Sequence, residues 1–304
     1  MSSRLAAPRA RLVETERRRI GEGFTLCEVG AGSGSLLGPL LDAVDTTDFD
    51  TDDFDVWAVE ASPAARRALE RLLPPERIVG DLDSLPAPIS GVVLANELID
   101  NLPMALAQRV EGEWRERWVG AEDDSLVFVD AAARDDVVSW LDRFAGDVPD
   151  SGWVEVQIEA AGWLEEMLGK IDRGSVVVID YGDTTEGLLP RRRDGTLRTY
   201  RAHHLGPHPL DEPGATDITA DVNFTALIAT AEAAGFKAEL HRQDDFLADL
   251  GLRDALSSLR QAELDAARTG DEEARLRIRS EKTATETLLH PRGLVDFRVL
   301  RDTR

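Results

Sequence analysis

The sequence predicts an α/β fold, in which a sheet of mainly parallel strands carries helices on both of its faces. Three observations support this prediction. An apolar run leads into a glycine-rich turn at residues 30–34 and then into an apolar helical pattern. Short apolar runs alternate with helical patterns along the chain, which is typical of a parallel sheet. Several of these runs end in an acid or an amide, and the carboxyl ends of parallel strands share one edge.

The first strand and its turn are predicted over residues 24–35. Three glycines follow the strand at alternate positions, Gly30, Gly32 and Gly34. Glycine permits the positive φ angles of a tight turn, and without a Cβ it lets a ligand approach the backbone. A dinucleotide site requires the spacing G-x-G-x-x-G. Here the third glycine comes one residue too early, which disfavours a dinucleotide; a glycine-rich turn without a ligand stays open as an alternative.

The remaining elements are predicted in order. Helices are expected over residues 36–44, 62–73, 160–171, 223–234 and most of 245–288, and strands over 56–60, 77–81, 90–95, 175–182, 236–240 and 294–300. Ser62-Pro63 is a favourable helix start, because serine caps the first turn and proline fits its first position. The run at 175–182 is the most apolar, so we expect it near the centre of the sheet.

Polar side chains stand where these strands end. Glu60 closes the second strand, where an acid can accept hydrogen bonds from both hydroxyls of a ribose. Asp81 follows the third strand, with Asp83 as a near alternative. The fourth strand is followed by three such residues, Asn96, Glu97 and Asp100. We therefore expect a ligand at this edge of the sheet, although Asn96 or Asp100 capping the following helix would explain them equally well.

The composition of the chain indicates which kinds of partner and which cellular compartment to expect. A net charge of −23 at pH 7 disfavours nucleic acid and anionic lipid and favours a cationic substrate, although solubility alone also accounts for it. The single cysteine, Cys27, excludes a disulfide framework, so we expect a cytoplasmic location. No apolar run approaches the roughly 20 residues of a membrane span. No His, Cys and acid cluster has metal-ligand spacing, so no metal is expected.

We expect one domain over residues 25–304, preceded by an N-terminal arm over residues 1–24. Two insertions are predicted. The first, at about residues 107–130, alternates apolar and polar residues around Gly112 and predicts a β-hairpin. The second, residues 183–222, is long and polar, and a stretch of that length is usually functional.

The second insertion carries most of the remaining candidate residues. Arg191-Arg192-Arg193 is predicted to be a solvated run, with an acidic partner as the alternative. Arg198 and Tyr200 are expected to order the loop over the site. His203 and His204 are candidates for a base or a substrate contact, but a loop histidine is more often a surface residue.

Four ordered segments resemble the MidA-type methyltransferases, which use S-adenosyl-L-methionine (SAM). Residues 95–103 are similar to the signature A-N-E-x-x-D-x-L-P, residues 179–182 to I-D-Y-G, and residues 195–203 to G-T-L-R-x-Y-x-x-H. Residues 217–224 are similar to D-I-T-A-H-V-D-F, with Asp221 and Asn223 where the family has His and Asp. The family's mitochondrial members are protein arginine methyltransferases needed for assembly of respiratory complex I.

The resemblance implies a class I SAM-dependent methyltransferase fold, a Rossmann-like sheet with an inserted hairpin and loop. It implies that SAM lies over Gly30, Gly32 and Gly34, with Glu28 near its amino group, Glu60 on its ribose, Asp81 at its adenine and Asn96 beside it. It implies an arginine of a partner protein as the acceptor, held by Glu97 and Asp100, with Asn96 available to donate or accept beside them.

Other functions stay open at this point. The runner-up is a methyltransferase acting on a small molecule or another side chain, and the next is a non-catalytic, SAM-binding assembly factor. A dinucleotide oxidoreductase ranks lowest because of the glycine spacing. Relatives carry a longer segment before the first motif, including G-D-F-x-T-[SA]-P-E-I-S, which helps close the site. Only 25 residues precede Leu26, so a more open site is expected.

Overall fold

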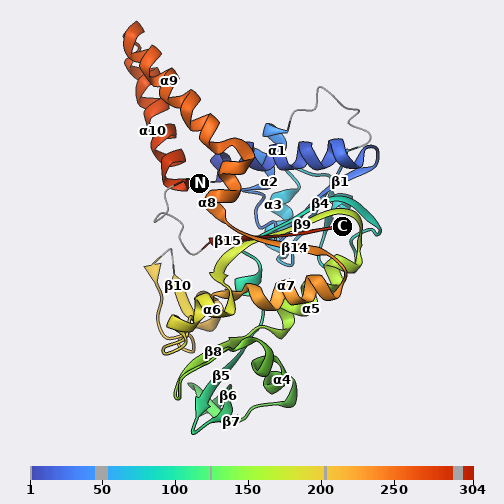
Figure 1. Ribbon diagram of the computed structural model, residues 1–304, viewed down its shortest axis with the longest axis vertical. Helices are drawn as coiled ribbons and strands as arrows, with labels where there is room; N and C mark the ends of the chain where they lie inside the picture. Colours follow the sequence, from blue (N-terminus) through green and yellow to red (C-terminus); the bar gives the residue numbers. More distant parts are fainter. Residues whose placement is uncertain (1, 45–53, 124, 202–203, 290–296) are drawn as a thin grey trace. The chain divides into compact units, whose positions relative to one another are not determined.

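The computed structural model of the 304-residue chain describes residues 2–44, 54–123, 125–201, 204–289 and 297–304 (Figure 1). The chain forms two compact units. Unit 1 consists of Met1–Asn96, Lys170–Ile179 and Glu239–Arg304, and unit 2 consists of Glu97–Gly169 and Asp180–Ala238. Each unit is described by itself below. The predicted domain boundary at residue 24 stays a prediction.

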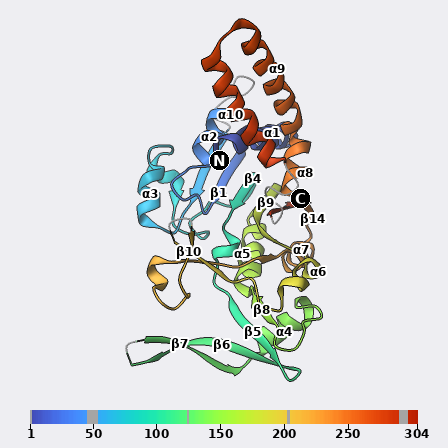
Figure 2. The same cartoon turned by 90° about the vertical axis from the view of Figure 1, so that its left-hand side faces the viewer.

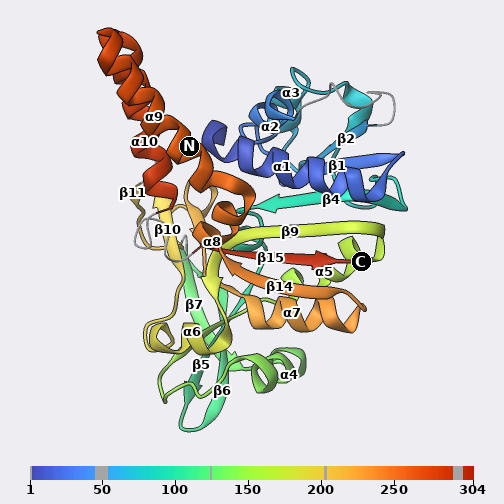
Figure 3. The same ribbon diagram turned by 45° about the horizontal axis from the view of Figure 1, so that its top comes forward.

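The main sheet confirms the predicted α/β fold. Its strands follow the order β14-β15-β9-β4-β1-β2-β3, and β13 pairs with the end of β9 (Figure 3). Their bounds are β1 Phe24–Val29, β2 Phe54–Val59, β3 Ile78–Val79, β4 Ile89–Asn96, β9 Ile171–Asp183, β13 Val222–Asn223, β14 Lys237–Arg242 and β15 Phe297–Thr303. The pairs β1–β2, β1–β4, β2–β3 and β4–β9 are parallel. The predicted central strand lies in β9, between β4 and β15.

Close backbone packing explains a glycine inside β4. A Cβ added at Gly91 would stand 1.8 Å from the carbonyl oxygen of Thr25 on the neighbouring strand β1. Any other side chain would therefore push β1 and β4 apart. The two strands carry the glycine turn and Asn96 at their carboxyl ends, so this packing helps to fix the position of the turn.

The longer helices of unit 1 are α1 Ser2–Ile20, α2 Leu37–Ala43, α3 Pro63–Leu69, α8 Gln243–Leu247, α9 Arg253–Thr269 and α10 Glu272–Leu288. The predicted start of α3 is confirmed, because Ser62 Oγ accepts a hydrogen bond from Ala65 N and Pro63 is the first helical residue. Helix α1 packs against α2, β1 and β4. Helices α9 and α10 form an antiparallel pair joined at Gly270, whose φ of 75° ends α9.

Unit 2 contains an antiparallel sheet with the strand order β7-β6-β5-β8 (Figure 2). Its strands are β5 Ala105–Val110, β6 Glu113–Glu122, β7 Ser125–Ala132 and β8 Trp153–Val156. The predicted hairpin is β5–β6, turning at Glu111 and Gly112 with φ values of 53° and 85°. Two consecutive positive φ angles are those of a type I′ turn, which suits the twist of a hairpin.

Unit 2 also contains the helices α4 Asp135–Phe144, α5 Ile158–Gly169, α6 Thr185–Leu188 and α7 Phe224–Ala233, and a small sheet of β10 Arg198–Arg201, β11 His204–Leu205 and β12 Asp217–Thr219. Helices α5 and α7 pack against each other, and α4 packs on β8. Across the described ranges, no helix combines the length and apolar character that crossing a membrane requires.

Candidate functional site

The glycine turn after β1 has the geometry that only glycine adopts easily. Gly30, Gly32 and Gly34 have φ angles of 72°, 54° and 78°. A Cβ on Gly34 would lie 2.4 Å from Leu72 Cδ1, so this glycine is needed for packing. A Cβ on Gly32 would meet no described atom within 4 Å. The turn is therefore closed on one side and open at Gly32, where a ligand can approach the backbone.

Glu60, at the end of β2, holds this turn directly. Its Oε2 accepts a hydrogen bond of 2.7 Å from Gly32 N, and its Oε1 accepts one of 2.8 Å from Ser62 N. The carboxylate is thus fixed beside the open part of the turn. Each carboxylate oxygen can accept a further hydrogen bond, so Glu60 remains able to receive two hydroxyl donors.

Glu28 is a buried acid directly before the turn, with 3% of its surface exposed. Burial raises the pKa of Glu28 to about 8, against the opposing effects of the Arg9 charge and the Leu37 backbone N–H. In the described part of the chain, Glu28 Oε2 has no hydrogen-bond partner. A buried carboxyl oxygen without a donor is costly, and a bound ammonium group would remove that cost.

The raised pKa of Glu28 predicts a pH-dependent stability. Its pKa is about 8 in the folded protein against an ordinary 4.5, so between these values the folded chain binds more protons than the unfolded chain. The contribution of Glu28 to stability is complete below the lower value and is lost as the pH rises through the higher one. Glu28→Gln is expected to flatten the fall in unfolding free energy between pH 5 and pH 8, measured by urea denaturation without cofactor. An unchanged slope would contradict this assignment.

Asp81 and Asn96 are both held by hydrogen bonds. Asp81 is exposed, and its Oδ1 accepts a hydrogen bond of 2.9 Å from Ser84 N. Hydrogen bonds from Ser84 lower the pKa of Asp81. Asn96, at the end of β4, accepts a hydrogen bond of 2.7 Å on Oδ1 from Arg9 Nη2. The structure thus gives Asp81 a local role in its turn, and its predicted contact with adenine stays a prediction.

Arg9 is a buried residue beside this site that the sequence did not predict. This residue lies on α1 with 1% of its surface exposed, and it joins α1 to β4 through Asn96. Its charge also lowers the pKa of Glu28, which keeps that carboxyl closer to ionisation. No local pattern marks Arg9 among the other arginines of residues 1–19, because its burial depends on contacts with distant strands.

Unit 2 contains a cavity of about 540 Å³, which we call the acidic cavity. Its lining comes from the segment after β4, the end of β9, β10 and β12. The lining residues are Glu97, Asp100, Asn101, Tyr181, Arg198, Tyr200, Asp217, Thr219, Ala220 and Asp221. The structure therefore brings the predicted Glu97 and Asp100 together with Arg198 and Tyr200, which the sequence placed in the loop over the site.

The acidic cavity carries an excess of negative charge. Asp221 forms ion pairs with Arg191 and Arg198. Arg198 is the cationic side chain in the lining, and its charge is engaged by that pair. Three more carboxyl groups line the cavity, from Glu97, Asp100 and Asp217. Such a site attracts a cation.

Asp100 is buried and oriented by two hydrogen bonds. Its Oδ2 accepts from Thr219 Oγ1 at 2.6 Å and its Oδ1 accepts from Asn101 Nδ2 at 2.6 Å. Burial raises the pKa of Asp100, and the charges of Glu97 and Asp217 add to the effect. A cation in the cavity would favour its ionised form.

Asp180, which the sequence reasoning did not single out, supports the backbone of Asp100. Its Oδ2 accepts hydrogen bonds from Ile99 N at 2.9 Å and from Asp100 N at 3.2 Å. Asp180 thus caps the short turn Ile99–Asn101. The carboxylate of Asp100 takes no part in this cap and accepts its hydrogen bonds from Thr219 and Asn101 instead. Burial raises the pKa of Asp180, and the neighbouring Asp100 raises it further.

Glu97 and Tyr181 complete the polar wall of the cavity. Glu97 is exposed and has a φ of 52°, a left-handed conformation that costs a side-chain-bearing residue of order 1 kcal/mol. Strain of this kind gathers at functional sites. Burial, with the charges of Glu97 and Asp100, raises the pKa of Tyr181 to about 12. Tyr181 therefore keeps its proton and can donate a hydrogen bond into the cavity.

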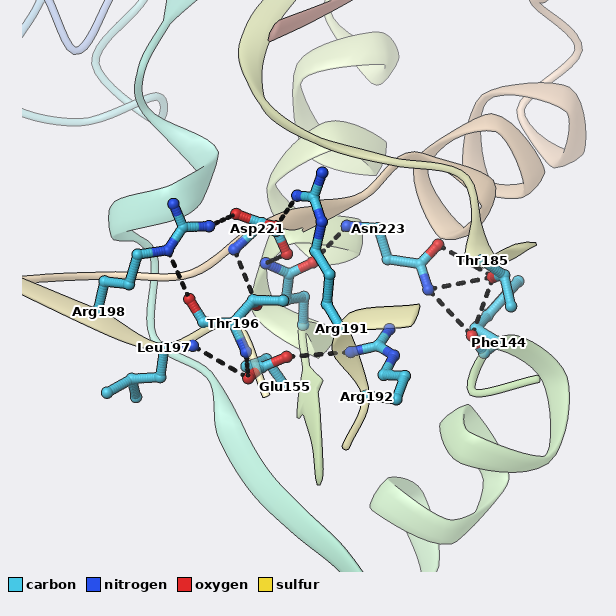
Figure 4. A network of polar contacts seen from close by, with 11 residues as sticks. Phe144, Glu155, Thr185, Arg191, Arg192, Thr196, Leu197, Arg198, Asp221 and Asn223 are labelled. Carbon is cyan, nitrogen blue, oxygen red and sulfur yellow. Dashed lines mark hydrogen bonds and ion pairs between the residues drawn. The ribbon is translucent and has the colours of Figure 1, made fainter. Parts of the chain in front are cut away.

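A buried ion pair organises the second insertion (Figure 4). Arg192 Nη1 lies 3.0 Å from Glu155 Oε2, and both residues are almost fully buried. Glu155 Oε1 also accepts hydrogen bonds from Thr196 N at 2.6 Å and Leu197 N at 3.2 Å. The prediction of a solvated run is wrong for Arg192 and for Arg191, which pairs with Asp221.

The two departures from the family motif have structural roles in this chain. Asp221 is the ion-pair partner of Arg191 and Arg198 described above. Asn223 caps α7, because its Oδ1 accepts a hydrogen bond from Ala226 N, and its Nδ2 donates to Phe144 O at 2.9 Å. Both residues therefore fix the end of the insertion.

The described histidines of this insertion, His204 and His208, are not among the residues that line the acidic cavity. His204 is exposed on β11, opposite Arg201 of β10. His203 lies outside the described residues, so its predicted role is untested. Within the described ranges, no group of three or more His, Cys, Asp and Glu residues can hold a metal ion. Cys27 is fully buried in β1, and burial raises the pKa of its thiol.

Residues 9–241 of the chain match the model of a family described as "Putative S-adenosyl-L-methionine-dependent methyltransferase". The chain is 28% identical over 255 residues to the mitochondrial protein arginine methyltransferase NDUFAF7 homolog of Drosophila melanogaster, covering 73% of this chain and 56% of that protein. It is 28% identical over 261 residues to human mitochondrial NDUFAF7, covering 75% and 56%. The chain spans about half the length of the curated relatives it matches.

Two solved structures from Burkholderia thailandensis share the whole fold. One was crystallised with S-adenosyl-homocysteine and has a TM-score of 0.82 and 27% sequence identity, covering 100% of this chain and 77% of that chain. The other has a TM-score of 0.83 and 27% identity, covering 100% and 79%.

Proposed function

Because the chain belongs to the family of S-adenosyl-L-methionine-dependent methyltransferases, we propose that it transfers the methyl group of SAM to an arginine side chain of a partner protein. The acidic cavity carries this proposal, because its lining holds more carboxylate than cationic charge. The order of residues along the chain also supports the proposal. Glu97, which lines the acidic cavity, directly follows Asn96, which is the last residue of β4 and a predicted contact of SAM. The names of the curated relatives point to the same acceptor.

The residues around the glycine turn fit SAM. Glu28 Oε2, which has no hydrogen-bond partner in the described part of the chain, suits the ammonium group of SAM. The carboxylate of Glu60, which is fixed by Gly32 N, suits the ribose hydroxyls. The turn is open at Gly32 and leaves room for the cofactor beside the backbone. When bound, SAM supplies an electrophilic methyl on a sulfonium. The chain's contribution is to hold and orient, because in-line methyl transfer depends mainly on positioning.

The carboxylates of the acidic cavity can help arginine to act as a nucleophile, which it does poorly by itself. A guanidinium is always charged and its lone pairs are delocalised. Glu97 and Asp100 can grip it by charge-assisted hydrogen bonds and turn one nitrogen toward the methyl donor. Asp100 is rigid because Thr219 and Asn101 hold it, whereas Glu97 is exposed and can pass the displaced proton to water.

A radiolabelling experiment with a fractionated cell extract distinguishes this function from the alternatives. A cell extract is separated by dialysis into a protein fraction and a small-molecule fraction, and the protein is incubated with methyl-radiolabelled SAM and both fractions together. We expect label in protein. Label only in small molecules would favour the small-molecule methyltransferase, and absence of label together with calorimetric SAM binding would favour a non-catalytic assembly factor. A cytoplasmic location stays a prediction, to be tested by cell fractionation.

A further inference from the structure

A second cavity in unit 2, of about 350 Å³, has a different character from the acidic cavity. We call it the apolar groove. Its lining comes from residues 101–106, from β6 and β7 of the antiparallel sheet, and from the loop of residues 183–222. Its main side chains are Met104, Leu106, Leu126, Phe128, Leu210 and Ile218.

The apolar groove and the acidic cavity share a wall. On β12, Asp217 and Thr219 line the acidic cavity, whereas Ile218 between them lines the apolar groove. Successive side chains of a strand point to opposite faces, so the two cavities lie on opposite faces of β12. Asn101 lines both cavities, so the two cavities are neighbours at that residue.

The lining of the groove offers no charge to a ligand. Among the described residues that line the groove, Arg117 is the one with a charged side chain. The Nε of Arg117 lies 2.7 Å from Asp130 Oδ1, and its guanidinium carbon lies 5.2 Å from the centre of the Phe128 ring. Its charge is therefore already engaged. The groove suits an uncharged, apolar group, just as the acidic cavity suits a cation.

The rim of the groove exposes apolar surface. Val119 on β6 is 57% exposed and Leu126 on β7 is 42% exposed, and the two strands are paired neighbours. Covering such surface by a bound chain would be favourable, at about 25 cal/mol for each Å² removed from water.

We propose that the apolar groove binds a large apolar side chain of the substrate protein, close in sequence to the arginine held in the acidic cavity. The inference rests on the proposed function. Opposite faces of a strand are about 10 Å apart at the level of their side chains, and about three extended residues span that distance. The preferred substrate is thus an arginine with Leu, Met or Phe within about three residues.

An oriented peptide library tests this inference. The probe is a set of peptides with one fixed arginine and randomised neighbours, and the readout is the sequence of the peptides methylated with SAM. We expect enrichment of Leu, Met and Phe within three residues of the arginine. Leu126→Asp is expected to raise KM for an enriched peptide at least fivefold while leaving kcat nearly unchanged, because it disturbs binding and leaves the acidic cavity intact.

Val129→Asp is the matched control. Val129 lies on the same strand, is 48% exposed and lies outside the groove lining, so its KM should equal that of the unmodified protein. Arginine methylation without apolar enrichment, or an equal loss in both variants, would overturn the inference and leave the proposed function standing. Binding of a fluorescent Leu-containing peptide that Leu126→Asp weakens, without any methylation, would support the groove and overturn the proposed function.

Discussion

Glu97→Gln is expected to lower kcat for arginine methylation by about 100-fold, the scale on which removal of one preorganised electrostatic contact acts. The substitution keeps the size of the side chain and removes the negative charge that faces the guanidinium. Because Glu97 belongs to the acidic cavity and not to the glycine turn, the dissociation constant for SAM should stay the same. The measurement pairs steady-state kinetics on an arginine peptide with calorimetric titration of SAM.

Asp147→Asn is the control for Glu97→Gln. Asp147 is an exposed acid of unit 2 outside the cavity lining, so neutralising it changes the net charge by the same amount. Its kinetics should match those of the unmodified protein. A Glu97→Gln variant with full activity would remove Glu97 from the reaction. Equal losses in both variants would mean that overall charge, and not the cavity, attracts the substrate.

Glu60→Ala is expected to weaken SAM binding by about 1.5–3 kcal/mol, or roughly 10- to 150-fold, because a charged acceptor of the ribose hydroxyls is removed. The variant also removes the acceptor for Gly32 N and so loosens the turn. Glu70→Ala is the control, because Glu70 is an exposed acid of the same unit that is not a predicted cofactor contact, and this variant should bind SAM normally. NAD should bind to none of these proteins. Unchanged SAM affinity in Glu60→Ala would show that the ribose is held elsewhere.

The glycine turn and the strand ends follow local rules, so the sequence could predict where they lie. Glycine positions and strand ends indicated Glu60 and Asn96, whereas Glu28 was implied by the family resemblance, and the contact of all three residues with SAM stays a prediction. The contact between Arg9 and Asn96 could not be predicted in the same way. It joins two residues that are 87 positions apart, and no local pattern records such a pair.

In the second insertion, residues 183–222, the contacts that hold the structure together could not be predicted from the sequence. Its arginine run, residues 191–193, was predicted to be solvated, but Arg192 forms a buried ion pair with Glu155. Hydrophobic periodicity cannot reveal such a support, because its members are charged. Asp180 was available in the I-D-Y-G motif, but its role in holding the backbone of Asp100 emerges only from the fold.

In the proposed function the methyl group of SAM is transferred to arginine. Complete acid hydrolysis of protein labelled with methyl-radiolabelled SAM, followed by chromatography of the amino acids against methylarginine standards, identifies the residue that carries the label. We expect the label to migrate as methylarginine and Glu97→Gln to remove most of it. Label on any other amino acid, with none on arginine, would rule out arginine as the methyl acceptor.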